Sequence, residues 1–216
     1  MKMITKQKEF AEIEKQIKNA KKIYLIGCGT CATMCETGGK NEVLQMKKKL
    51  ENIGKEITGW MVIPTACDIL TKEAIKQEKR PIKESDLVMV MTCGFGVQRV
   101  ADHVDKLVFP ALDTLFIGKE DEEEREFIQV CAQCGECVLG TTAGICPIVS
   151  CHKGLLNGPC GGTDKGKCEV DKEKDCAWVL IYNRLKKLDR LDLMEKRQVP
   201  KNYQKVVKPG KIRVKE

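Results

Sequence analysis

Cysteine spacing constrains this chain more than any other feature. Of its 13 cysteines, eight fall between positions 131 and 176, and they begin with Cys131-x-x-Cys134-x-x-Cys137. Three cysteines in this rhythm can place three thiolates around one small volume, as in the binding loops of many iron–sulfur clusters. The next cysteine, Cys146, is followed by Pro147. A Cys-Pro pair also ends the cluster-binding run of bacterial ferredoxins, where fewer residues separate it from the preceding cysteine. The sequence therefore predicts metal centres, with iron–sulfur clusters as the first interpretation.

The cysteine-rich stretch holds enough thiols for two sites of four ligands each. Spacing alone does not assign cysteines to sites, because the cysteine before proline ligates the other cluster in two-cluster ferredoxins. Tetrahedral zinc is the alternative, although zinc sites usually show two separated C-x-x-C pairs. One site of each kind also fits the spacing. The eight candidate ligands are Cys131, Cys134, Cys137, Cys146, Cys151, Cys160, Cys168 and Cys176.

Apolar periodicity predicts an α/β domain over residues 1–120. Short apolar runs indicate strands at 23–26, 57–63, 87–92 and 114–117. Helical spacing indicates helices at 5–20, 37–53, 68–79 and 97–107, the second capped by Gly54 and the third ended by Pro81. Strands that alternate with helices form parallel sheets through right-handed crossovers. The predicted fold class is therefore α/β, with a small parallel, Rossmann-like sheet.

Beyond this domain the sequence predicts an irregular metal-binding domain over 121–195 and a basic tail over 196–216. The acidic run 121–126 is interpreted as a linker or helix start at the boundary. Metal ligation would stabilise a stretch with so little apolar content. One helix is expected after Asp175, with Trp178, Ile181, Leu185 and Leu188 on one face. The tail alone should be disordered or extended.

A second group of cysteines lies near the start of the chain. Cys28, Cys31 and Cys35 follow the first predicted strand, Cys67 follows the second, and Cys93 follows the third. Carboxyl ends of parallel strands meet at one edge of a sheet, so we expect these thiols to converge on a cluster site. Cys93 or Cys67 would supply the fourth ligand. The alternative is that both are small buried apolar residues, as free cysteines often are.

Glycines in the first cysteine loop match another kind of site. Gly27-x-Gly29-x-x-Ala32 after a strand fits the dinucleotide fingerprint. However, the next helix is expected only from Thr37, and no acidic residue ends the second strand to bind a ribose. We therefore interpret the glycines as positions where the backbone approaches a cluster closely.

Composition argues against several other classes of protein. The formal net charge of +7 counts every cysteine as neutral, and aromatic residues make up only 5%. With few stacking side chains, no nucleic-acid partner is expected. The longest apolar runs are strand-sized, so no membrane span is predicted. Residues 1–20 show no apolar signal segment, and 13 cysteines suit a reducing interior, so we expect a cytoplasmic protein.

Acid–base catalysis has few candidates. The chain has two histidines. His103 is predicted at the surface, on the helix after the third strand. His152, beside Cys151, is a candidate for binding or hydrogen-bonding a cluster sulfur. No Ser/His/Asp triad, paired-carboxylate site or P-loop is visible in the sequence.

The cysteine pattern resembles a known module. The resemblance rests on four segments: Cys131-Ala-Gln-Cys134-Gly-Glu-Cys137, Gly144-Ile-Cys146-Pro147, Asn157-Gly-Pro-Cys160-Gly-Gly162 and Asp175-Cys176-Ala-Trp178. They are similar to the cysteine-rich C-terminal domain of certain methylenetetrahydrofolate reductases. The loop from Gly27 to Cys35 and the run Met91-Thr-Cys93-Gly also resemble the small iron–sulfur subunit of the acetogen-type enzyme. The resemblance covers nearly the whole chain except the tail.

The resemblance implies an accessory role. The small subunit of that family pairs with a flavin-containing reductase that converts methylenetetrahydrofolate to methyltetrahydrofolate in the one-carbon metabolism of the Wood–Ljungdahl pathway. It implies two or three [4Fe–4S] clusters, zinc in addition, and electron transfer from a ferredoxin or similar donor to the partner's flavin. The competing hypothesis is a structural or regulatory zinc module without a redox role. A third is a catalytic cluster at Cys28, Cys31 and Cys35 with an open fourth position.

Overall fold

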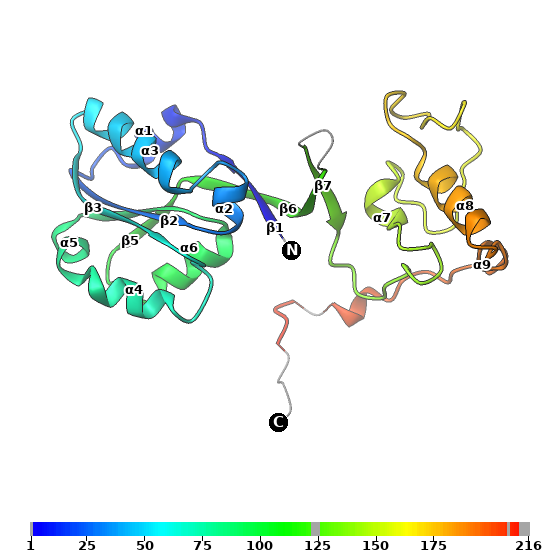
Figure 1. The fold of residues 1–216 in the computed structure, drawn as a ribbon. Helices are drawn as coiled ribbons and strands as arrows, with labels where there is room; N and C mark the ends of the chain where they lie inside the picture. The colour runs from blue at the N-terminus through cyan, green and yellow to red at the C-terminus, as the bar shows by residue number, and fades with distance from the viewer. Residues whose placement is uncertain (1, 122–125, 207, 212–216) are drawn as a thin grey trace. The chain divides into compact units, whose positions relative to one another are not determined.

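The computed structural model describes residues 2–121, 126–206 and 208–211 (Figure 1). The chain divides into two compact units, Met1–Phe116 and Ile117–Glu216. The division falls within strand β6 (Leu112–Asp121), whereas the predicted domain boundary lies at the end of that strand. Within the described residues, no helix is long and apolar enough to cross a membrane.

The first unit is built on a four-stranded parallel sheet. The strands are β2 (Lys22–Cys28), β3 (Glu56–Ile63), β4 (Leu87–Met91) and β5 (Leu107–Pro110), in the order β3-β2-β4-β5. Cys28 pairs in register with Ile63, and Gly27 with Met91, so three strands end at the same edge. Strand β4 is buried at every position, as expected inside a sheet covered on both faces. The predicted α/β class with a parallel sheet is confirmed.

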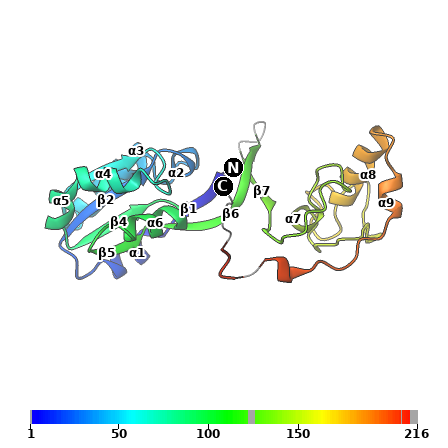
Figure 2. The ribbon, with the colours of Figure 1, turned by 90° about the horizontal axis from the view of Figure 1, so that it is seen from below.

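Helices cover both faces of this sheet (Figure 1). The helices α1 (Phe10–Gln16) and α3 (Lys40–Asn52) lie on one face, and α4 (Thr71–Gln77), α5 (Lys79–Glu84) and α6 (Gly94–Ala101) lie on the other. Helix α6 packs against β4 and β5, the strands that it connects (Figure 2). Right-handed crossovers produce this arrangement when the direction of strand addition reverses after β3.

Helix α3 shows how local sequence sets these elements. Val43, Met46 and Leu50 recur at helical spacing and are buried against the sheet. After the helix, Gly54 takes a left-handed φ of 78°, and the Lys55 N–H donates to the Leu50 carbonyl at 3.1 Å. These are the features of a glycine-terminated helix end, so the predicted cap at Gly54 is confirmed.

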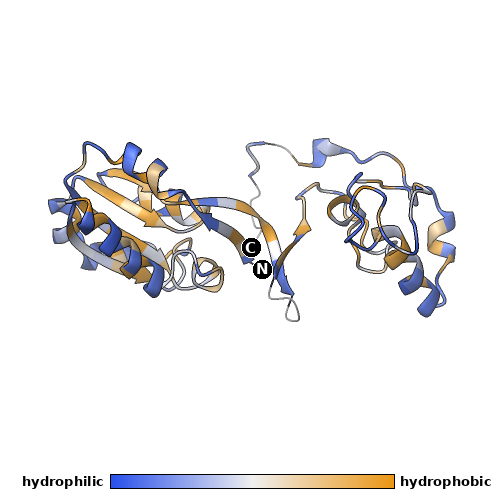
Figure 3. Cartoon of the chain, turned by 90° about the horizontal axis from the view of Figure 1, so that it is seen from above, coloured by the Kyte–Doolittle hydropathy of each residue, from blue (hydrophilic) through white to orange (hydrophobic). Residues whose placement is uncertain are grey.

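The core of the first unit lies between the sheet and its helices. Ile23, Leu25 and Val90 from the strands are fully buried, as are Ile13 from α1 and Val100 from α6. Figure 3 shows the hydrophobic colours concentrated in these strands. Burial of each large apolar side chain is worth about 1.5–3 kcal/mol. This unit therefore has a substantial core built from apolar side chains.

Two predicted helices have different bounds in the structure. The helix predicted over 5–20 starts only at Phe10, because Lys2–Gln7 form strand β1. Strand pairing there overrides the helical pattern. Pro81 does not end a helix but lies in the first turn of α5, where its missing N–H needs no partner.

Two further predictions are confirmed only in part. The helix predicted over 97–107 ends at Ala101, and Leu107, which is 71% exposed, starts β5. Residues 114–117 lie in a strand as predicted, but this strand, β6, belongs to a separate sheet. That sheet has the order β1-β6-β7, with β7 (Glu126–Cys131) antiparallel to β6.

The acidic run 121–126 does not begin a helix at its described ends. Asp121 ends β6, and Glu126, its partner in register, begins β7. The predicted linker or helix start otherwise falls on residues 122–125, which lie outside the described residues. The strand pairing continues up to both ends of this gap.

The second unit has little regular structure. Beyond β7 its helices are α7 (Pro147–Ser150), α8 (Ala177–Lys187), α9 (Asp192–Glu195) and a 3₁₀ turn at Tyr203–Lys205. Its buried core consists of Cys176, Trp178, Ile181 and Leu185. The helix predicted after Asp175 is confirmed, but Cys176 is its N-cap. Leu188 is 57% exposed, because the helix ends at Lys187.

Part of the basic tail is attached to the second unit. Asn157 and Gln198 exchange two hydrogen bonds, with the side-chain amide donating at 2.9 Å and the Gln198 N–H donating at 2.7 Å. Glu136 pairs with Lys205 at 2.6 Å and accepts from the Asn202 N–H at 2.9 Å. The described part of the tail is largely irregular, as predicted for an extended segment. These hydrogen bonds and the ion pair hold it to the rest of the second unit.

Candidate metal centres

The loops after β2 and β4 meet at the position where open α/β sheets bind ligands. The chain leaves β2 toward β3 and then returns past β2 to β4, so the crossover direction reverses between β2 and β4. Ligand sites form outside the carboxyl ends of the strands at such a switch point. Cys28 is the last residue of β2, Cys93 is the N-cap of α6 after β4, and both are buried.

The loop after β2 is folded tightly by hydrogen bonds. It contains a one-turn helix, α2 (Cys31–Met34), which the sequence did not predict, and Cys35 ends it. The Thr33 hydroxyl donates to the Cys28 carbonyl at 2.7 Å, and the Cys28 N–H donates to the Gly38 carbonyl at 3.0 Å. Hydrogen bonds within the protein therefore hold the backbone of the loop that contains Cys28, Cys31 and Cys35.

The thiols of this edge lie within electrostatic range of one another. Burial raises the pKa of the Cys67 thiol, and negative charge on Cys93, Cys28 and Cys31 raises it further. Burial likewise raises the pKa of Cys35, with a smaller contribution from Cys31. The structure thus brings thiols from three separate loops to one edge of the sheet. Their role as ligands remains a prediction.

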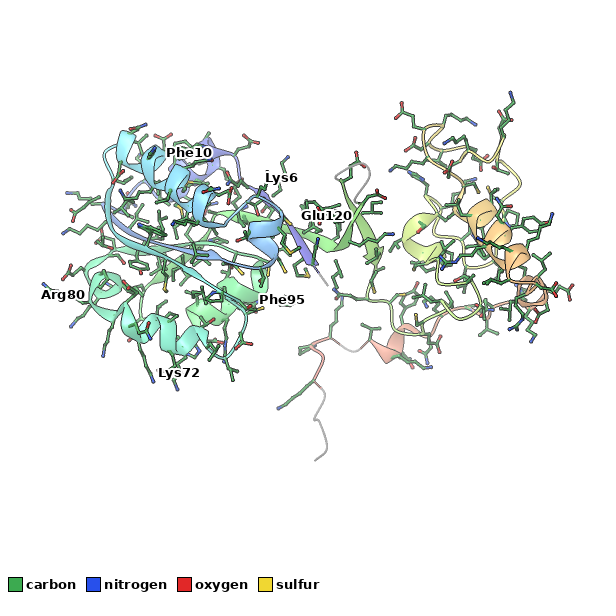
Figure 4. The ribbon with its side chains drawn as sticks, viewed as in Figure 1. Lys6, Phe10, Lys72, Arg80, Phe95 and Glu120 are labelled. Atoms are coloured by element: carbon green, nitrogen blue, oxygen red, sulfur yellow. The ribbon has the colours of Figure 1, made fainter. Side chains whose placement is uncertain are left out.

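Cys67 is the exposed member of this group. Together with Phe95, Gln98, Arg99 and Asp102 it lines an open cavity of about 430 Å³. Phe95 is 53% exposed and lies at one end of the first unit (Figure 4). Cys67 therefore reaches solvent at a cavity that it shares with an exposed aromatic ring.

The glycines of this loop allow close packing of protein backbone. A Cβ at Gly27 would lie 2.5 Å from the Gly38 carbonyl oxygen, and one at Gly29 would lie 3.1 Å from the Pro64 carbonyl oxygen. The first contact leaves no room for a side chain, and the second is tight. The glycines therefore let this loop pack closely against the backbone at Gly38 and at Pro64, the residue that follows β3.

In the second unit, four of the eight cysteines line one small cavity. Its volume is about 20 Å³, and its lining includes Ala177 and Trp178 at the start of α8. The four cysteines that line it are Cys151, Cys160, Cys168 and Cys176. Sequence spacing left the assignment of these residues open, whereas the fold places them together.

Charged side chains surround this cavity. The Cys160 thiol donates to the Glu169 carboxylate at 3.2 Å, and Glu169 also pairs with Lys153. The Lys153 ammonium, followed by the Cys160 thiol, lowers the pKa of Glu169. His152 Nδ1 lies 3.8 Å from the Cys168 sulfur, and His152 Nε2 lies 3.6 Å from Asp171. His152 thus lies beside a cysteine of this cavity, and its predicted role of binding or hydrogen-bonding a cluster sulfur stays a prediction. Lys153 and Glu169 were not predicted from the sequence.

The other four cysteines of this unit fall on neighbouring elements. Cys131 ends β7, and Cys146 is the N-cap of α7, which packs against β7. Between them the loop turns through left-handed residues, with a φ of 54° at Gln133 and 80° at Gly135. This turn lets the Gln133 N–H donate to the Cys131 sulfur at 3.3 Å. The loop carries the remaining two thiols, Cys134 and Cys137.

The donor sets suit soft metal centres, although their geometry is not that of a formed site. Thiolates are the ligands that iron–sulfur clusters and structural zinc prefer. Backbone N–H groups donate to two of the cysteine sulfurs, from Gln133 to Cys131 and from Gly162 to Cys160. Among the described residues, however, no group of three or more His, Cys, Asp or Glu side chains is arranged to hold a metal ion.

Comparison with known proteins identifies the C-terminal part of the chain. Residues 109–204 match the family described as methylene-tetrahydrofolate reductase C terminal. The chain therefore contains a domain of this family, which starts in β5 and includes all eight cysteines of the second unit. Searches of the curated proteins and of the solved structures found no match.

Lys153 and Glu169 could not be recognised in the sequence as neighbours of the cysteine cavity. Each stands among other charged residues in a chain where 32% of residues are charged. The signal that exists is adjacency, because Glu169 follows Cys168 and Lys153 lies two residues after Cys151. Adjacency becomes informative only once the fold shows which cysteines share a cavity.

Proposed function

We propose that this chain is an iron–sulfur electron-transfer subunit of a methylenetetrahydrofolate reductase complex. It would relay electrons to the flavin of a catalytic partner subunit, which reduces methylenetetrahydrofolate to methyltetrahydrofolate. The observation that carries this proposal is the convergence of Cys28, Cys67 and Cys93 at the switch point of the sheet. The match of residues 109–204 supplies the link to the reductase.

Each group of thiols has a distinct role in this proposal. Two or three [4Fe–4S] clusters, when bound, would supply one-electron redox chemistry. Cys28, Cys31 and Cys35 would hold the first, with Cys93 or Cys67 completing it. The loop from Cys131 to Cys137, with Cys146, would hold the second. Buried β2 and β4 would keep the first thiol group in place, and the solvent-facing side at Cys67 and Phe95 offers a short route to a redox partner.

One observation favours zinc at the remaining group. The cavity between Cys151, Cys160, Cys168 and Cys176 has a volume of about 20 Å³. That is close to the space of a single water-sized sphere, about 10–15 Å³, which suits one ion better than a cubane of eight atoms. Tetrahedral zinc at this position would stabilise the fold and carry no electrons. The chain would then combine redox centres with one structural site.

Metal analysis of two variants tests both parts of the proposal. The chain is purified without oxygen, together with the protein that copurifies with it, and iron, zinc and sulfide are measured per chain. Cys31→Ser is expected to lower iron and sulfide, and Cys160→Ser is expected to lower zinc. Cys67→Ser and Cys93→Ser, compared separately, identify the thiol that completes the first site.

Spectroscopy and activity decide between electron transfer and a scaffold. The wild-type protein is expected to absorb near 400 nm and to give an EPR signal after reduction with dithionite, with the signal returning to baseline when reductase substrate is added. Reduced ferredoxin is the donor to be tested first. A colourless, iron-free chain that supports full reductase activity would refute the electron-transfer role and leave the zinc scaffold.

A further inference from the structure

The first unit contains a cavity that the thiol groups do not use. Its volume is about 620 Å³, and it is lined by α4, α5 and the loop that connects α6 to β5. This loop enters the amino end of β5, whereas the cysteine loops leave the carboxyl ends of the strands. Figure 4 shows Arg80 of α5 and Phe95 of α6 at opposite ends of the unit. The volume is typical of small-molecule sites, which span about 300–1,000 Å³.

Lysines dominate the charged lining of this cavity. Lys76, Lys79, Lys83 and Lys106 line it, against the single carboxylate of Asp105. Lys76 is paired with Glu73 at 2.7 Å, and Lys106 lies within electrostatic range of Asp86. Lys79 and Lys83 form no ion pair with any residue that the structure describes. Two of the four lining lysines, Lys79 and Lys83, are therefore without an ion-pair partner among the described residues.

The cavity also has an apolar floor. Ile75 and Ile82 are buried members of the core, and Val104 packs against that core while lining the cavity. A solvated row of lysines on a helix needs no such enclosed apolar surface. The combination of an apolar floor and a cationic lining fits a ligand with an apolar part and an anionic part.

His103 adds an unused hydrogen-bonding group. The sequence predicted this residue at the surface of a helix, but it follows α6 and is only partly exposed. Its Nε2 atom is enclosed and has no hydrogen-bond partner, and it is the only such buried side-chain nitrogen or oxygen in the described part of the chain. An enclosed polar atom without a partner carries a free-energy cost, which a ligand oxygen would remove.

We propose that this cavity binds a small organic phosphate with two or more negative charges. Ammonium groups bind phosphate as point charges, so Lys79, Lys83 and Lys106 would hold the phosphates. His103 would add a hydrogen bond, and the floor of Ile75, Ile82 and Val104 would contact the apolar part. The site is separate from the metal centres, and its existence does not depend on the proposed electron transfer.

Titration calorimetry with two probes tests the ligand class. The full-length chain is titrated with ADP and with pyrophosphate, which has the charge but no apolar part. ADP is expected to bind in a saturable manner at least about tenfold more tightly than pyrophosphate, because only ADP uses the floor. Equal affinities would overturn the assignment to an organic phosphate. Tighter binding of a polyglutamate peptide than of ADP would overturn the small-molecule site in favour of an acidic protein segment.

A matched pair of double variants locates the binding. Lys79→Gln/Lys83→Gln removes two charges from the lining, and Lys15→Gln/Lys48→Gln removes two exposed charges from α1 and α3 on the opposite face. The first pair is expected to weaken ADP binding about tenfold or more, and the control to change it less than about twofold. Equal losses in both variants would show diffuse attraction to a basic surface and would refute the site.

The imidazole signals give a readout that does not depend on any variant. The chain has two histidines, so proton NMR can follow His103 and His152 separately. A phosphate bound near His103 is expected to shift the ring-proton resonances of that imidazole, because it places negative charge and a hydrogen-bond acceptor beside the ring. The resonances of His152, in the other unit, should not move. Saturating ADP that leaves the His103 resonances unchanged would place the ligand elsewhere and overturn the proposal.

Discussion

The two units of this chain place cysteines on very different supports. In the first unit, Cys28 and Cys93 extend directly from buried strands of a parallel sheet with a large apolar core. In the second, the cluster of buried apolar side chains among the described residues comprises Cys176, Trp178, Ile181 and Leu185, and Cys176 is itself a candidate ligand. The thiols of the first unit are thus carried by a fold that stands without them. In the second unit a candidate ligand is itself part of the buried core, as in small domains that metal binding stabilises.

Metal removal should separate the two units most clearly. A chelator added without oxygen is expected to unfold the second unit and leave the first intact, because only the second lacks an apolar core of sufficient size. Limited proteolysis should then yield a protected fragment close to residues 1–116. Equal protection of both units before and after chelation would contradict this comparison.

A substitution that creates a cavity in the core of the first unit should have the next largest effect on stability. Leu25→Ala is expected to lower the free energy of unfolding of the first unit by about 2–5 kcal/mol, since Leu25 is fully buried. Urea denaturation gives the value, and the control Ile69→Ala, at a side chain 74% exposed, should change it by less than about 0.5 kcal/mol. The zinc content should not change in either variant. Loss of zinc in Leu25→Ala would show that the units do not fold independently.

Deletion from Pro200 onward should weaken complex formation with the reductase and leave the metal content unchanged. The reason is that the basic tail carries surface for a partner, while its own contacts with the unit are few. Analytical gel filtration with the partner and metal analysis measure the two effects. Glu136→Gln, which breaks the pair with Lys205, should raise hydrogen exchange in the tail without shortening it. Loss of iron on deletion would instead place the tail in the support of the Cys131 loop.

The smallest expected effect concerns acid stability of the first unit. The backbone N–H groups of Lys22 and Lys21 lower the pKa of Asp86 below its ordinary value of 3.8. A carboxyl with a lowered folded-state pKa stabilises the fold above its unfolded-state pKa, and this stability is lost as pH falls through the folded-state value. Urea midpoints measured from pH 6 down to pH 2 should therefore fall less steeply below pH 3.8 in Asp86→Asn than in the wild type. Glu14→Gln, an exposed carboxylate on α1, is the control, and identical slopes in all three proteins would contradict the prediction.

Strong local patterns made most of the first unit predictable. The strands β2, β3 and β4 and the helix α3 could be predicted because their apolar residues form strand-length runs or recur at helix spacing. Strand β5 was missed, because four residues leave too little pattern, and β1 was read as a helix. In both cases the strand exists through pairing with a distant strand, which the local sequence does not encode.

The sequence by itself determined that thiols occur in two groups, since their spacing and their positions after strands can be counted along the chain. Only the tertiary structure decided that Cys151, Cys160, Cys168 and Cys176 share one cavity. The tertiary structure also encloses the Nε2 atom of His103, a residue that lines the lysine-rich cavity of the first unit. The physical reason is that ligand groups and cavities are made by residues far apart in the chain. Their distances follow from how the whole core packs and not from any local pattern.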